Sequence, residues 1–190
     1  MTNHAYFNLN ANVDGTGTVL DHVINAPSAS LFIPVDENLI PTGTIEPVPD
    51  YLNFTSPKTI AQDIDSGTVT ADGGYDNALV FSDYAPGMPQ RQVVAMHSPL
   101  TGIALLASTD QFSTQIYSGN ALDGTIKRKA SQCDGAAESC FYEWRGAATL
   151  EMQLGIDNAN HRDSGMPSID LKAGEEYTQH SSYKFGVVYP

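Results

Sequence analysis

Residues 147–154 read AATLEMQL, and this stretch decides the fold that the sequence predicts. Its apolar side chains stand at every second position, and Thr149, Glu151 and Gln153 stand between them. A period of two is typical of a β-strand, whose successive side chains point to opposite faces of a sheet. We therefore expect a strand with one face in the core and a carboxylate at the centre of its polar face.

That carboxylate, Glu151, has two interpretations. A glutamate on the wet side of an antiparallel sheet usually faces solvent and does no chemistry. A glutamate held in a cleft can instead act as a general base. The stretch by itself leaves both interpretations open.

A second alternating stretch, TNHAYFNL, covers residues 2–9. His4, Tyr6 and Asn8 fall on one face of the expected strand, and the apolar side chains between them fall on the other. A lone histidine on a polar strand face is more often solvated or structural than catalytic. Its role therefore depends on which groups the fold brings to it.

Short alternating stretches recur along the whole chain, separated by Gly, Pro, Asn and Asp. They are HVINAP, ALVFSD, RQVVAMHSP, GIALLAS, TQIYSGN, AATLEMQL and SYKFGVVY. This pattern predicts an all-β protein. The clearest helical signal is SPKTIAQDI, residues 56–64, in which a serine precedes Pro57, and Ile60 and Ile64 lie four apart. It predicts one short helix or a pair of turns.

The composition narrows the class of protein. The 190 residues, 20.4 kDa in mass, suit one domain over residues 1–190. Nine Lys and Arg against 22 Asp and Glu give a net charge of −13, which disfavours nucleic acid and anionic membranes as partners. No apolar run has the length of a membrane span. A neutral small molecule is therefore the expected partner, and the composition leaves the oligomeric state open.

The location of the protein is left open by two features. A cytoplasmic location is the default for a chain of this kind, whereas the sequon at Asn53 and the close pair Cys133 and Cys140 suit a secreted protein. The two cysteines can form a local disulfide or remain free thiols, and spacing does not decide between these states.

Two further stretches carry groups suited to a sugar. GGYDN places Asp76 beside a Gly-Gly turn, where a carboxylate can accept hydrogen bonds from hydroxyls. TQIYSGN places Gln115 and Tyr117 on one strand face, and an amide beside an aromatic ring suits carbohydrate. Motifs for nucleotide, zinc and serine-hydrolase chemistry are missing from the sequence, so we expect no cofactor and no metal.

Together these stretches resemble the aldose 1-epimerase (galactose mutarotase) family. TNHAYFNL resembles the family's Asn-His-x-Tyr-Phe-Asn-Leu signature, GGYDN its Gly-Tyr-Asp-His, TQIYSGN its Gln-x-Tyr-x-Gly-Asn strand and TLEMQ its Leu-Glu-x-Gln. LDHVINA, IPVDENLIPTGTIEPV and LKAGEEYTQHSSYKF also match in order. Seven motifs in register between residue 2 and about residue 185 make the resemblance specific.

The resemblance implies an antiparallel β-sandwich of the galactose mutarotase type and an isomerase that interconverts the α and β anomers of hexoses such as glucose or galactose. It implies that His4 is the general acid on the ring oxygen and Glu151 the general base on the anomeric hydroxyl. Asp76, Gln115 and Tyr6 are then contacts to sugar hydroxyls. The other histidines inherit no role.

Relatives in this family run to roughly twice this length. Their N-terminal half supplies an Asn-Arg pair and a second histidine, so we expect a C-terminal portion of such a protein, with its activity in question. A non-catalytic carbohydrate-binding module with the same sandwich is the alternative. An enzyme acting on hexose 6-phosphates ranks last, because none of the four arginines lies in a matching motif.

Overall fold

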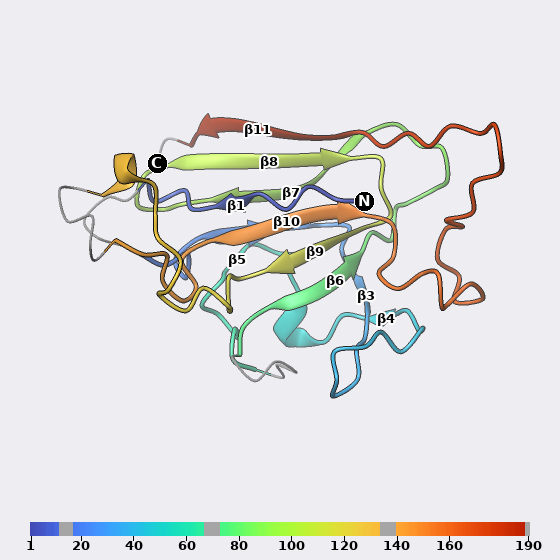
Figure 1. Cartoon of the computed structure of the whole chain (residues 1–190), viewed down its shortest axis with the longest axis horizontal. Helices are drawn as coiled ribbons and strands as arrows, with labels where there is room; N and C mark the ends of the chain where they lie inside the picture. The colour runs from blue at the N-terminus through green and yellow to red at the C-terminus, as the bar shows by residue number, and fades with distance from the viewer. Residues whose placement is uncertain (12–16, 67–72, 134–139, 189–190) are drawn as a thin grey trace.

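The computed structural model describes residues 1–11, 17–66, 73–133 and 140–188, which form two antiparallel β-sheets (Figure 1). The six-stranded sheet has the order β1 (Tyr6–Phe7), β10 (Ala148–Gln153), β9 (Ser113–Tyr117), β6 (Asp76–Val80), β3 (Leu31–Ile33) and β4 (Glu46–Pro47). The five-stranded sheet has the order β11 (Ser181–Val187), β8 (Ile103–Thr109), β7 (Arg91–His97), β2 (Val23–Asn25) and β5 (Lys58–Thr59). The described residues also include two short 3-10 turns, η2 (Asp50–Leu52) and η3 (Ala130–Gln132). The all-β prediction is confirmed.

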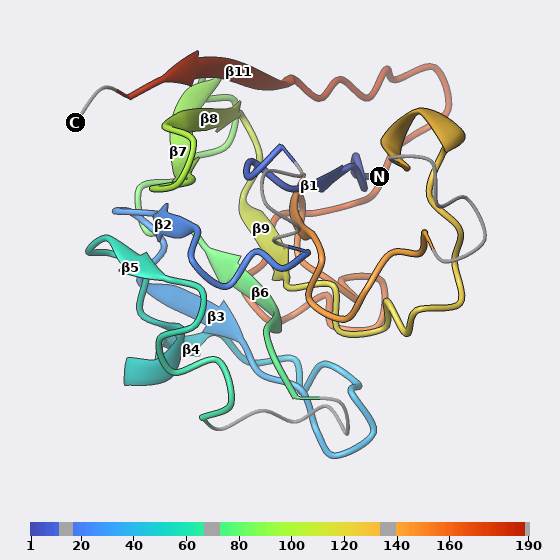
Figure 2. The ribbon, with the colours of Figure 1, turned by 90° about the vertical axis from the view of Figure 1, so that its left-hand side faces the viewer.

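The two sheets pack against each other around one main core, as the second view shows (Figure 2). Leu150 and Met152 of β10 enter this core from one sheet, and Met96 and Leu105 enter it from the other. Each of these side chains is at most 1% exposed. Burying an apolar side chain of this size contributes roughly 1.5–3 kcal/mol, so the alternation seen in the sequence is the pattern that holds the sheets together.

All seven stretches predicted as strands contain a strand of the structure, although Tyr189, the last residue of SYKFGVVY, lies outside the described residues. Of the two alternatives for residues 56–64, the short helix is wrong, whereas turns do occur there. Lys58–Thr59 forms β5, which pairs with β2, and a turn follows. The N–H of Ile60 donates to His22 O at 2.8 Å, so this backbone bonds across the sheet and not within a helix. Ile60 and Ile64 are both buried because the turn brings them to the core.

Strand β11 forms the edge of the five-stranded sheet and is exposed over most of its length. Phe185 and Val187 are 54% and 56% exposed. An apolar edge strand of this kind favours association with another chain or segment. Among the described residues, no helix is long and apolar enough to cross a bilayer.

Candidate active site

Antiparallel pairing lines up polar side chains on the outer face of the six-stranded sheet. Tyr6 of β1 pairs with Thr149 of β10, so His4, two residues before Tyr6, reaches the position opposite Glu151. Glu151 in turn pairs with Gln115 of β9. Because side chains alternate, these groups all project from the same face.

The polar side chains line one cleft of about 480 Å³. Its lining consists of His4, Tyr6, Asp76, Gln115, Tyr117, Glu151, Gln153 and Ile156. All five residues that the sequence nominated for the site therefore surround a single cavity. Its volume falls within the usual range of small-ligand sites, about 300–1,000 Å³.

His4 and Glu151 meet directly at this cleft. The Nε2 atom of His4 lies 3.3 Å from Glu151 Oε1. The imidazole side chain is 52% exposed and the carboxylate side chain 10% exposed, so the histidine stands at the rim and the glutamate at the floor. The hydroxyl of Thr149 donates to the same carboxylate oxygen at 2.8 Å. The interpretation of Glu151 as a solvent-facing residue is wrong.

Asp76 and Gln115 form a second polar pair in the cleft. Gln115 Nε2 donates to Asp76 Oδ1 at 2.7 Å. The other amide atom, Gln115 Oε1, is buried and has no hydrogen-bond partner among the described residues. Because buried polar atoms are normally paired, this oxygen is an acceptor suited to a hydroxyl donor from a ligand.

Two tyrosines supply aromatic surface beside these groups. The rings of Tyr6 and Tyr117 lie edge to face with centroids 6.3 Å apart, and the His4 ring lies 5.2 Å from that of Tyr6. Burial raises the pKa of Tyr6 above its ordinary value, and negative charge from Glu151 and Asp76 adds to the effect. The Tyr6 phenol therefore remains a hydrogen-bond donor through the neutral pH range.

The segment that carries His4 is held by contacts outside its short strand. The N–H of Leu9 donates to His22 Nε2 at 2.8 Å, and Thr101 Oγ1 donates to Leu9 O at 2.7 Å. The Phe7 ring packs 5.1 Å from the Tyr183 ring. His22, which the resemblance left without a role, thus lies beneath the site-bearing segment. Its complete burial had no signal in the local sequence.

Basic side chains are engaged elsewhere. Arg91 pairs with Asp83 at 2.9 Å, Arg145 with Asp65, and Arg162 with Asp170. Within the described part of the chain, neither Lys nor Arg lines the cleft. A phosphate dianion would need such a cation, so the cleft gives no support to the hexose 6-phosphate interpretation.

Three lining residues lie outside the five nominated ones: Tyr117, which the TQIYSGN stretch had already placed on the face of Gln115, and two that the sequence did not single out. Gln153 follows Glu151 by two positions and shares its strand face, so the period of two was a usable signal for it. Ile156 lies in the turn after β10, where the sequence pattern carries no such signal. In the described ranges, no group of three or more His, Cys, Asp or Glu side chains is arranged to hold a metal ion.

Comparison with known proteins gives consistent matches. The family model described as Aldose 1-epimerase matches residues 1–184. A probable aldose 1-epimerase of Arthroderma benhamiae is 35% identical over 199 residues, covering 90% of this chain and 44% of that protein. The galactose mutarotase of Rattus norvegicus is 31% identical over 188 residues, covering 98% of this chain and 49% of that protein.

A crystal structure of a GalM/aldose epimerase homologue from C. elegans matches with a TM-score of 0.73 and 27% identity, covering 99% of this chain and 51% of that chain. The matches confirm the resemblance and the type of sandwich. The chain spans about half the length of the curated relatives it matches.

Proposed function

Because the chain belongs to the aldose 1-epimerase family, we propose that it interconverts the α and β anomers of an aldohexose such as glucose or galactose. The observation that carries this proposal is the meeting of His4 and Glu151 at the cleft, with Nε2 and Oε1 3.3 Å apart. An imidazole and a carboxylate at this spacing form an acid and base pair that can act on two neighbouring oxygens of one sugar.

In the proposed reaction Glu151 removes the proton from the anomeric hydroxyl O1 while His4 donates a proton to the ring oxygen O5. The C1–O5 bond breaks, and C1 becomes an open-chain aldehyde. Rotation about C1–C2 presents the other face of the carbonyl to the O5 hydroxyl. The steps then run backwards, so that His4 takes its proton back from O5 and Glu151 returns a proton to O1.

The arrangement of the two groups suits these roles. Glu151 is fixed at the floor by the Thr149 hydroxyl, and a fixed carboxylate loses little freedom when a substrate binds. His4 stands at the exposed rim, with its side chain 52% exposed. Because Nε2 and Oε1 are in direct contact, the proposed reaction requires the His4 ring to rotate outward when a sugar enters between the two groups. Positioned acid and base groups of this kind typically contribute about 10²–10⁴-fold to the rate.

The rest of the cleft favours a neutral polyol. Asp76 and the unpaired Gln115 Oε1 are acceptors for sugar hydroxyls, and the Tyr6 phenol is a donor. The tyrosine rings offer an apolar surface to the C–H face of a pyranose. Lys and Arg do not line the described cleft, which agrees with an uncharged substrate.

Polarimetry tests this proposal. Freshly dissolved α-D-glucose or α-D-galactose should reach anomeric equilibrium faster with the chain than in buffer alone. Glu151→Gln keeps the size of the side chain and its contact with Thr149, and it should lower kcat/KM by about 10²–10⁴-fold because the base is lost. His4→Ala should have an effect of similar size. Glu46→Gln, at an exposed glutamate of β4, is the matched control and should leave the rate unchanged.

A carbohydrate-binding module without turnover is the second candidate. One observation favours it: the described cleft lining contains no Lys or Arg to orient the sugar. Calorimetry and polarimetry on one sample separate the two functions. Binding of glucose or galactose without acceleration of mutarotation would support the module and refute the isomerase.

A further inference from the structure

Outside the cleft, residues 53–55 form the N-glycosylation sequon Asn53-Phe54-Thr55. None of the other asparagines in the sequence is followed two positions later by serine or threonine. Such triplets arise often by chance, so the sequon by itself is weak. A glycosylation site also has to meet two independent requirements, an accessible asparagine amide and an oxidising compartment, and the structure bears on both.

The first requirement is that the asparagine amide is accessible and presented outward. Asn53 is exposed and follows directly after η2, whereas Phe54 is completely buried. The Phe54 ring packs 5.2 Å from the Tyr75 ring, and the N–H of Ala26 donates to Phe54 O at 2.7 Å. The middle residue of the sequon therefore anchors the loop, and the asparagine beside it projects into solvent.

The amide of Asn53 is also oriented. Its Oδ1 accepts the Thr55 N–H at 3.0 Å and the Thr55 hydroxyl at 2.6 Å. A backbone N–H can only donate, so the acceptor has to be the amide oxygen and the assignment of the two amide atoms is fixed. The amide nitrogen Nδ2 then points away from the threonine. This is the atom to which a glycan is attached.

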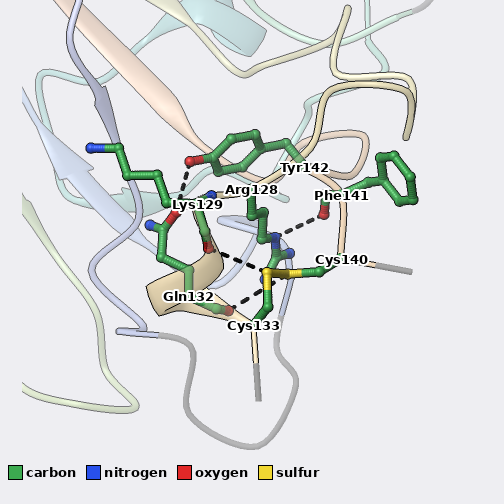
Figure 3. Close-up of a disulfide and its surroundings, with 7 residues drawn as sticks. All are labelled: Arg128, Lys129, Gln132, Cys133, Cys140, Phe141 and Tyr142. Carbon is green, nitrogen blue, oxygen red and sulfur yellow. Dashed lines mark hydrogen bonds between the residues drawn. A yellow bond between two sulfur atoms is a disulfide. The ribbon is translucent and has the colours of Figure 1, made fainter. Parts of the chain in front are cut away.

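The second requirement is an oxidising compartment, and the described structure contains a disulfide that indicates one. Cys133 and Cys140 are joined, with their Cα atoms 5.7 Å apart (Figure 3). The N–H of Arg128 donates to Cys140 O at 3.0 Å, and Arg128 Nε donates to Phe141 O at 2.8 Å. Structural disulfides persist in the secretory pathway and are rare in the cytosol. The same pathway carries out N-glycosylation.

We propose that Asn53 is a site of N-linked glycosylation in the secretory pathway. The glycosyl donor is an oligosaccharide attached through its anomeric carbon to a lipid pyrophosphate. Asn53 Nδ2 forms the new bond to that carbon and loses one proton, while the C1–O bond to phosphate breaks and the lipid pyrophosphate leaves with the electron pair. The site lies beside the five-stranded sheet, because Asn25 of β2 donates from Nδ2 to Thr55 O at 3.2 Å. None of the residues 53–55 lines the cleft.

The test is cell-free translation of the whole chain behind a cleavable secretion leader, with and without microsomal membranes. The protease-protected product should show a single upward step in mass, which an endoglycosidase removes. Peptide N-glycosidase should convert Asn53 to aspartate, which tandem mass spectrometry reads at that position. Alkylation before reduction should show Cys133 and Cys140 already joined in the same product.

Variants make the result specific. Asn53→Gln and Thr55→Ala should abolish the mass step, whereas Thr55→Ser keeps a sequon and should retain it. Asn38→Gln removes an exposed asparagine outside any sequon and should not change the step. An unmodified Asn53 peptide in protected product with a closed disulfide would overturn the proposal, and so would a mass step that persists in both Asn53→Gln and Thr55→Ala. The outcome is independent of mutarotation, because glycan attachment is measured by mass alone.

Discussion

His22 gives the sharpest test of how the site-bearing segment is held. It is completely buried and accepts the Leu9 N–H on Nε2, so its proton is on Nδ1, 3.1 Å from Asp21 Oδ1. Burial lowers the pKa of His22 below 6.5, and His97 adds to this effect, while Asp21 opposes it. Protonating Nε2 would also remove the acceptor for Leu9. The folded protein therefore holds this ring neutral.

This difference in pKa makes stability depend on pH. In the unfolded chain His22 titrates near its ordinary pKa of about 6.5. Between that pH and the lower pKa of the folded state, the unfolded chain binds a proton that the folded chain does not. The free energy of unfolding contributed by His22 is therefore fully present above about pH 6.5 and falls as the pH falls, by up to about 1.4 kcal/mol per pH unit.

Two substitutions separate the parts of this contribution. In His22→Gln the amide oxygen can still accept the Leu9 N–H but does not titrate, so we expect the pH dependence from this site to vanish. In His22→Ala the buried N–H is orphaned and a cavity remains, so we expect a loss of roughly 3 kcal/mol or more above about pH 6.5 and a smaller loss below it, where the wild-type contribution of His22 itself falls. His22→Ala should also slow mutarotation, because Leu9 lies on the segment that carries His4.

The assay is urea unfolding followed by circular dichroism at pH 8, 7, 6 and 5. The remaining histidines are shared by the wild-type chain and His22→Gln, so their contributions cancel in the difference between the two. That difference should change steadily below about pH 6.5. If the two stabilities instead run parallel from pH 8 to pH 5, the fold does not hold His22 neutral.

Three further predictions follow from individual contacts. Asp76→Asn removes the charge that Gln115 contacts and that a sugar hydroxyl would contact in the proposed complex. It should raise KM about tenfold, about 1.4 kcal/mol, with a smaller change in kcat. An unchanged KM in polarimetric assays would remove Asp76 from the proposed sugar site. The Tyr183 hydroxyl donates to Leu150 O at 2.7 Å, so Tyr183→Phe should lower the free energy of unfolding in urea by about 1 kcal/mol. Burial raises the pKa of Tyr183 to about 12, so the same variant should lack one tyrosine that ionises near that pH in an ultraviolet titration. Phe185 is 54% exposed on an edge strand, so Phe185→Ser should reduce concentration-dependent self-association of the chain in sedimentation velocity runs. Equal association of both proteins would show that this edge does not mediate self-association.

Sequence alternation predicted the strands well because it reports a local property. A side chain two positions along a strand always returns to the same face, so the pattern around Leu150 already placed Glu151 opposite the core. The helical alternative for residues 56–64 failed for a related reason. The spacing of Ile60 and Ile64 fits a helix, but it fits equally well a strand followed by a turn when the backbone donors are used by a neighbouring strand.

The resemblance to known motifs nominated five site residues, and the structure adds what surrounds them. Glu151 could not be recognised from alternation as buried, because a polar strand face can be wet or covered. Gln115 Oε1 is left without a partner because the amide nitrogen of the same side chain donates to Asp76, which comes from another strand. The anchoring role of His22 depends on Leu9, which lies on a separate segment.

Taken by itself, the sequence determined the fold class, the strand faces and the chemical types of the candidate site residues, because all of these follow from local periodicity and from motifs read in order. The tertiary structure decided that His4 and Glu151 lie 3.3 Å apart, that the arginines pair away from the cleft, and that Asn53 projects from a buried anchor. These outcomes depend on strand register and on packing between segments far apart in the chain. The two-residue period indicates which face of the sheet a side chain occupies, but only the pairing of strands determines which other side chains it contacts.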